Sequence, residues 1–167
     1  MSSPVVRNFM RQQGFPEEPA PVCDMRFQGL YFQPRIVGPL VVVAIVLHSA
    51  AIFFALSAVL WWNVLLPAWN PFERAYNRLI AARRGKAALT PAPGPRRFAQ
   101  GMAAAFLIVA GVALAHGWVV TAWIFEGFLV MAFAMLLFGK FCLGAYVYFL
   151  LRGQFGFANA TLPWARR

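Results

Sequence analysis

Apolar residues fill two long zones of the chain, and polar or basic stretches lie before, between and after them. The first zone runs from Ile36 to Leu66, and the second covers residues 99–151. Gly117-Trp118 divides the second zone into two runs, each long enough to cross a bilayer as a helix. The pattern predicts an all-α, polytopic integral membrane protein.

The first zone permits two interpretations. As one helix, its 31 residues would be about 46 Å long, against a hydrocarbon core of about 30 Å. That is too long for one upright span and short for two complete ones. Two spans become feasible if the first begins near Phe27. A single long tilted helix from Ile36 to Leu66 is the alternative.

A weak internal repeat favours two spans in the first zone. Arg26-Phe27 precedes the first zone, and Arg97-Phe98 precedes the second at an offset of 71 residues. Ala75-Tyr76 follows the first zone, and Ala145-Tyr146 lies at the end of the second, at an offset of 70. The repeat predicts four transmembrane helices arranged as two hairpins.

The positions of the basic residues support the same layout independently. The 15 Lys and Arg fall before residue 36, between residues 67 and 98, or from residue 140 onward. With two hairpins, every base lies on one face, and the uncharged turns near His48 and His116 lie on the other. This distribution is typical of a cytoplasmic membrane protein whose termini both face the cytoplasm.

These observations divide the chain into five segments. We expect a flexible cytoplasmic tail (residues 1–25), a first helical hairpin (26–66), a basic cytoplasmic connector (67–98), a second hairpin (99–152) and a C-terminal tail (153–167). The stretch GKFCLGAYVYFLLR is expected to extend the last helix to the membrane surface.

The connector contains an amphipathic stretch, predicted as an interfacial helix over residues 70–84. Asn70 is placed to cap it, Pro71 suits its first position, and Glu73 occupies the third, as in a capping box. Its rings are expected to anchor in the interface and its bases to contact anionic head groups. The predicted anchors are Trp69, Phe72 and Tyr76, and the predicted head-group contacts are Arg74, Arg78, Arg83, Arg84, Lys86, Arg96 and Arg97.

Composition and charge argue against a soluble domain, a nucleic-acid-binding protein and a scaffold held by disulfides or zinc. The chain is 61% hydrophobic and 12% charged, whereas soluble domains carry about 25% charged residues. The net charge is +10, but the bases flank apolar segments, so the lipid bilayer and not nucleic acid is the expected partner. Two distant cysteines, Cys23 and Cys142, supply neither a disulfide framework nor a zinc site.

Four residues are candidates for chemistry. Glu126 lies within an apolar run, where a carboxyl group is costly and usually faces protein, a partner or a proton path. We expect it to form one hydrogen bond with a neighbouring span. The alternatives are proton or ion handling and contact with another subunit or with a quinone-like molecule. His48 and His116 lie near turns, and Cys142 lies near the cytoplasmic end of the last span. No metal or cofactor is predicted, and a contact with haem, chlorophyll or quinone stays open.

Three motifs carry a family resemblance: NPFERAYN, PAPGPRRFAQG and FCLGAYVYFLL, in that order between Met25 and Arg152. The chain resembles the bacterial membrane family catalogued as domain of unknown function 4395. The resemblance implies several membrane helices in two halves. Some relatives have genes near thioredoxin-like or sulfurtransferase proteins, which implies thiol chemistry, and some carry a second cysteine shortly after the position of Cys142. Here Leu143, Gly144 and Ala145 follow it.

The sequence therefore predicts a small accessory or scaffold subunit of a larger membrane complex, without catalysis of its own. Other membrane subunits are the expected partners, and small residues such as Gly101 and Ala105 suit close helix packing. Two alternatives stay open: a membrane thiol-redox or sulfur-relay protein that uses Cys142, and a small transporter or proton path that uses Glu126.

Overall fold

The computed structural model describes residues 3–165, and every regular element within them is a helix. The side chain of Arg84, a predicted head-group contact, lies outside the described part. The α-helices are α1 (Pro4–Gln12), α2 (Ala20–Leu30), α3 (Phe32–Val46), α4 (Ala50–Leu65), α5 (Pro71–Tyr76), α6 (Ala82–Arg84), α7 (Gly94–Ala115), α8 (Val119–Leu137), α9 (Leu143–Leu151) and α10 (Phe155–Ala160). A 3₁₀ turn, η1 (Pro67–Trp69), precedes α5, and a π-helical turn, η2 (Asn77–Ala81), follows it.

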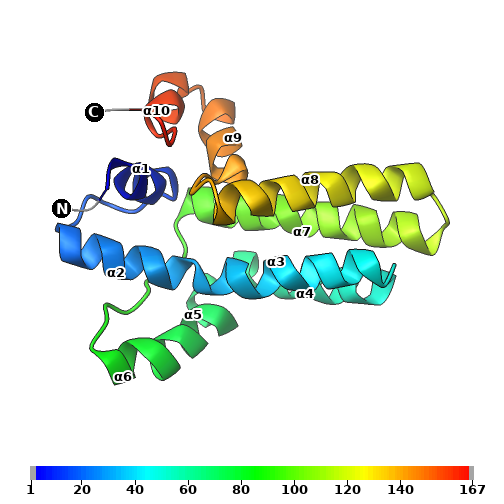
Figure 1. The fold of residues 1–167 in the computed structure, drawn as a ribbon, viewed down its shortest axis with the longest axis horizontal. Helices are drawn as coiled ribbons and strands as arrows, with labels where there is room; N and C mark the ends of the chain where they lie inside the picture. Colours follow the sequence, from blue (N-terminus) through cyan, green and yellow to red (C-terminus); the bar gives the residue numbers. More distant parts are fainter. Residues whose placement is uncertain (1–2, 166–167) are drawn as a thin grey trace.

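Four helices lie side by side and form the centre of the fold. α3 packs on α4, α4 on α7, α7 on α8, and α8 on α3, so the four contacts close a ring. Both short turns, between α3 and α4 and between α7 and α8, lie at the same end of the molecule (Figure 1). The other helices gather at the opposite end, with both ends of the described chain.

Three helical stretches are long and apolar enough to cross a membrane. They are Ala20–Val46, Gly94–Ala115 and Val119–Leu137. α4 is too short to cross a membrane alone. It is long enough only together with Pro67–Ala81, and a bend of 120° separates the two segments. Residues 3–165 therefore contain three candidate spans, or four if this bent pair is one span.

The helices are interrupted at the two places where the sequence predicted turns. α3 ends before His48, whose φ of 46° is in the left-handed region, and Ser49 then caps α4 by accepting from the Ile52 amide. α7 ends before Gly117, whose φ is 70°. The residues from Ile36 to Leu66 therefore do not form one uninterrupted helix.

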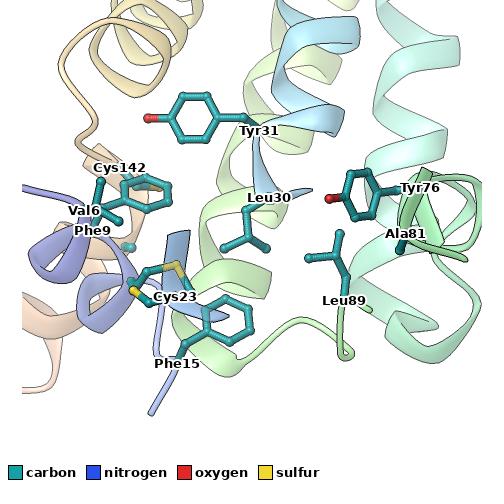
Figure 2. Close-up of a cluster of buried hydrophobic side chains, with 12 residues drawn as sticks. Val6, Phe9, Phe15, Cys23, Leu30, Tyr31, Tyr76, Ala81, Leu89 and Cys142 are labelled. Atoms are coloured by element: carbon teal, nitrogen blue, oxygen red, sulfur yellow. The ribbon is translucent and has the colours of Figure 1, made fainter. Parts of the chain in front are cut away.

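Buried side chains form two clusters, one between the four central helices and one at the end opposite the turns. Phe53, Leu107 and Leu129 lie in the first cluster. In the second, Leu30 lies between Tyr76 and Leu89 on one side and Cys23 on the other (Figure 2). The second cluster joins both halves of the chain.

The prediction of a flexible tail over residues 1–25 was wrong for the part that the structure describes. Residues 4–12 form α1, which Ser3 caps, and α2 begins at Ala20. Phe9 of α1 is 2% exposed and packs against Phe27 and Tyr31. This burial of apolar side chains stabilises the segment against the rest of the fold.

The last span does not continue into residues 139–152, contrary to the prediction. α8 ends at Leu137, and Lys140 has a φ of 50°, which no helix accommodates. α9 then leaves in a different direction and packs against α7 (Figure 1). Gly144 permits this contact, because a Cβ there would lie 2.7 Å from the Cα of Ala99.

The connector forms helical turns close to the predicted range. The Asn70 side chain accepts from the amides of Phe72 and Glu73, which confirms the predicted cap. Tyr76, predicted as an interfacial anchor, is 3% exposed and packs inside the second cluster, so that prediction was wrong. Its ring lies against Gly29, where an added Cβ would be 2.8 Å away.

Candidate functional site

Glu126 is buried within α8, with 6% of its surface exposed. Its Oε1 forms no hydrogen bond with any described residue. This oxygen therefore does not make the hydrogen bond to a neighbouring span that the sequence predicted for the carboxyl group. His48, from the turn between α3 and α4, is near enough to act electrostatically on the carboxyl group. The structure thus brings together two of the four candidates, near the end of the bundle that carries the turns.

Both histidines lie exposed at turns. The Nδ1 of His116 is 3.0 Å from the Val112 carbonyl, one turn earlier in the same helix, and its ring packs against Trp118 with centroids 5.1 Å apart. His116 therefore covers the end of α7. Among the described residues, no group of three or more His, Cys, Asp or Glu is arranged to hold a metal ion.

The bases of the connector divide into exposed and internal ones. Arg78 and Arg83 are exposed. Arg74 lies over the Trp69 ring at 4.4 Å, which places a predicted head-group contact on a predicted anchor. Lys86 donates to the Gln28 side chain over 2.9 Å.

Arg96 is buried, so the prediction that it contacts lipid head groups was wrong, whereas Arg97 is half-buried. Arg96 is 6% exposed. Arg97 donates from Nε and Nη2 to the Val64 carbonyl, at 3.0 and 2.8 Å. The last carbonyls of a helix have no partner within it, so Arg97 satisfies one at the end of α4.

Arg96 forms an ion pair with Glu73 inside the protein. Their Nε and Oε1 atoms are 3.8 Å apart, and both side chains are 7% exposed. That distance is too long for a hydrogen bond. Burial raises the pKa of the Glu73 carboxyl group, and the Arg96 guanidinium opposes this rise.

Close to Arg96 the four central helices line a partly open cavity of about 120 Å³, which also borders α1 and α9. Its wall is mostly apolar. Four phenylalanines contribute to it: Phe9, Phe106, Phe128 and Phe133. The polar lining residues are Gln13, Gln33, Arg96, Gln100 and Cys142.

Three polar atoms at this cavity have no hydrogen-bond partner in the described chain. They are the Nε2 of Gln13, the Nε of Arg96 and the Oε1 of Gln100, and each side chain belongs to a residue that is more than nine-tenths buried. Gln100 uses its Nε2 to donate to Gln33 over 3.0 Å. Each of these atoms has less than 1 Å² of accessible surface, so it faces the surrounding side chains and not the cavity.

Cys142 is buried at the edge of the same cavity. Its amide donates to the Gln12 Oε1 over 2.9 Å, which holds α1 against the start of α9. Arg96 is close enough to interact electrostatically with it. Cys23 is buried in the second cluster with Cys142.

Of this polar group, the sequence analysis singled out only Cys142 as chemically active. One signal was available: Gln100 is the single polar residue between Phe98 and Ala115, and such residues are rare in membrane helices. No pattern marks Gln13, because its position depends on the folding of α1 onto the bundle.

The all-helical fold and its long apolar helices are compatible with a membrane protein. The chain belongs to the family described as Domain of unknown function (DUF4395), whose model matches residues 28–153. This match confirms the resemblance drawn from the three motifs. No curated protein and no solved structure matches the chain.

Proposed function

We propose that α3, α4, α7 and α8 cross a cytoplasmic membrane as two hairpins, with both termini and the connector in the cytoplasm. The bases support this layout, because none occurs between residues 36 and 70 or between 98 and 139. Large apolar side chains exposed along the bundle suit contact with lipid, among them Leu40, Val43, Phe54, Ile108, Ile124 and Val130.

Tryptophans near both ends of the bundle suit the two membrane interfaces. Trp118 and Trp123 lie near the turn between α7 and α8, and Trp62 and Trp69 lie near the end of α4. α4 has 16 residues, about 24 Å of helix, so its span is completed by the irregular turn that follows.

Cysteine labelling tests the topology. Single cysteines at Ser3, Ala88 and Ala165 should react with a membrane-impermeant reagent only after the membrane is opened, and a cysteine at Gly117 should react in intact cells. Labelling of Ala88→Cys in intact cells would contradict the two-hairpin layout.

Within this layout the chain serves as an accessory subunit of a larger membrane complex. The observation that carries this proposal is Gly127, an exposed glycine in the interior of α8. A glycine there lowers helix stability by about 1 kcal/mol relative to alanine, and an added Cβ would meet nothing within 4 Å. Exposed Trp123 and Met131 flank it one turn away on each side. Small residues of this kind let a helix of another subunit approach closely.

Gly127→Leu tests the accessory role directly. The protein has open space at this position, so its own fold should be unchanged. A partner that copurifies stoichiometrically in mild detergent should be lost from the variant. Ala58→Leu is the matched control, because Ala58 is exposed on α4. Equal partner recovery from wild type and Gly127→Leu would refute the proposed contact.

A second candidate function is thiol chemistry at Cys142. It is favoured by the position of this thiol at the cavity edge beside Arg96. Cys142→Ser should leave the accessory role intact. Complete loss of function at normal protein level and normal assembly would favour the thiol function instead.

A further inference from the structure

We propose that a groove between α4 and α7 binds one anionic phospholipid, with the lipid phosphate at Arg97 and an acyl chain over Gly101. The proposal rests on the two-hairpin layout proposed above, which puts this end of the bundle at the cytoplasmic face of the membrane. It does not depend on the accessory role, because Gly127 lies on α8.

The groove is large, open to one side and mostly apolar. It measures about 540 Å³ and lies beside Trp61 and Val64 of α4 and Gly101 and Met102 of α7. Pockets that hold small ligands measure about 300–1,000 Å³, so a segment of an acyl chain fits. Gly101 has no side chain, and a larger residue there would extend from the floor of the groove toward Val64 and Trp61, which lie 3.7 and 4.0 Å from an added Cβ.

The Arg97 guanidinium lies in the wall of this groove and keeps one nitrogen available for a phosphate. Its Nε and Nη2 donate to the Val64 carbonyl, which fixes the position of the group. Its Nη1 is neither hydrogen-bonded to a described residue nor one of the buried atoms that lack a partner, so it is accessible. Within residues 3–165, Arg97 forms no ion pair with a carboxylate. Its charge is therefore open to an anion, and guanidinium groups form strong charge-assisted hydrogen bonds with phosphate.

A second base, Arg152, lies beside the groove where α7 begins. Its Nη1 donates to the Tyr148 hydroxyl over 2.6 Å, and the Tyr148 ring packs against Phe98 of the groove wall, with centroids 5.7 Å apart. The same hydroxyl lies 3.2 Å from a Cβ added at Gly94, which begins α7 and also lines the groove. Arg152 is exposed and, like Arg97, has no carboxylate partner in the described part of the chain. Two positive charges without a counter-ion thus lie near the start of α7.

These charges favour an anionic lipid over a zwitterionic one. Among the described residues, no acidic side chain lines the groove. The ammonium group of a zwitterionic head would therefore meet two guanidinium groups and no carboxylate, and like charges repel. A glycerol head adds no positive charge and leaves the phosphate negative.

The order of these groups along the bundle matches the order of groups in a phospholipid. Arg97 lies in the first turn of α7, and Gly101 lies about 6 Å further along the helix, toward the middle of the bundle. Trp62 and Trp69, near the end of α4, suit the membrane interface at the same end. The phosphate would therefore lie at the membrane surface and the acyl chain in the hydrocarbon.

Binding is tested with the full chain in detergent micelles, titrated with phosphatidylglycerol or with phosphatidylethanolamine, and native mass spectrometry counts the bound lipids. One phosphatidylglycerol should bind at least tenfold more tightly than any further one and than the first phosphatidylethanolamine, as expected for one charge-assisted hydrogen bond. Equal binding of the two lipids would overturn the proposal. Orientation in the membrane does not enter this measurement, so a wrong topology would appear only in the cysteine labelling.

Three variants locate the bound lipid. Gly101→Leu fills the groove and should remove the tight site, and Gly127→Leu is the matched control, because the same change on α8 leaves the groove untouched. Arg97→Met should weaken phosphatidylglycerol binding at least tenfold, and Arg152→Gln about fivefold. Tight binding of wild-type strength by a folded Gly101→Leu variant would refute the site. If Gly101→Leu and Arg97→Met fail to fold, Arg152→Gln decides at its exposed position, and an unchanged affinity there refutes the site.

Two other outcomes would assign the groove to a different occupant. Glycerol 3-phosphate, which has the phosphate but no acyl chain, should not displace the lipid at equal concentration, and equal displacement would replace the lipid with a soluble phosphate compound. Loss of a copurifying partner from Gly101→Leu, with phosphatidylglycerol binding retained, would assign the groove to a helix of another subunit and would likewise overturn the proposal.

Discussion

The two halves of the chain follow the same order of elements but differ in the continuity of their helices. The first half (residues 32–84) consists of α3, α4 and the connector turns, and the second half (residues 94–151) consists of α7, α8 and α9. α7 has 22 residues without interruption, whereas α3 has 15 and is separated from α2 at Tyr31. Pro34 explains this break, because it has no N–H to donate to the Leu30 carbonyl.

The shorter helices of the first half depend on polar groups of the second half. Arg97 bonds to the last turn of α4, Gln100 donates to Gln33, and the Ser57 hydroxyl donates to the Ala104 carbonyl over 2.8 Å. The Tyr31 hydroxyl donates to the Leu136 carbonyl over 2.6 Å. Hydrogen bonds to α7 and α8 therefore stabilise the interrupted helices of the first half.

Removal of the Glu73 carboxylate should lower the free energy of unfolding more than any other substitution discussed below. Glu73→Leu leaves the buried Arg96 charge without its counter-ion, which should lower the free energy of unfolding by about 3–5 kcal/mol. Arg96→Leu should be milder, because burial already raises the pKa of Glu73 and the carboxyl group can take up a proton. Unfolding in mixed micelles measures both, with Arg78→Leu as the exposed control. Equal effects of Glu73→Leu and Arg78→Leu would contradict this role.

Removing the Arg97 guanidinium should have the next largest effect. Arg97→Met keeps an apolar stem but loses both hydrogen bonds to Val64, which should destabilise the protein by about 1.5–3 kcal/mol. Arg97→Lys should recover part of the loss, because it restores one charged donor. The same unfolding assay applies. No difference between the Met and Lys variants would show that the guanidinium does not support the end of α4.

Two glycines allow close packing to be compared at α2 and at α9. At Gly144 an added Cβ would lie 2.7 Å from the backbone of Ala99, which cannot rotate away. At Gly29 it would meet the side chains of Tyr76 and Leu89, which can shift. Gly144→Ala should therefore destabilise by about 1–3 kcal/mol and Gly29→Ala by less. Thermal unfolding of both variants in detergent checks this order, and a larger effect at Gly29 would reverse it.

The all-helical class, the two breaks near His48 and His116 and the Asn70 cap followed from local patterns in the sequence. Each of these features depends on a few residues that are neighbours in the sequence, so it can be predicted without knowing the tertiary structure. Arg96 was misassigned because a base beside an apolar run usually reaches water, and only the position of Glu73 on a distant helix explains its burial. The packing of α1 was missed because its polar Gln12 and Gln13 are buried through contacts with α9 and the cavity.

Glu126 should show the smallest effect on stability, and it distinguishes a structural role from a chemical one. The sequence predicted one hydrogen bond between Glu126 and a neighbouring span, which Glu126→Leu would break. The structure shows no partner for Oε1 among the described residues, so Glu126→Leu leaves no hydrogen-bonding group unsatisfied, and neither Glu126→Gln nor Glu126→Leu should lower the free energy of unfolding by more than about 0.5 kcal/mol. Unfolding in mixed micelles measures this change, and complex yield and activity are measured in parallel. If the carboxyl group carries protons, Glu126→Gln should abolish activity in a fully assembled protein, because an amide cannot titrate. If Glu126 contacts another subunit instead, Leu should reduce complex yield while Gln, which keeps the size and the polar oxygen, should retain it.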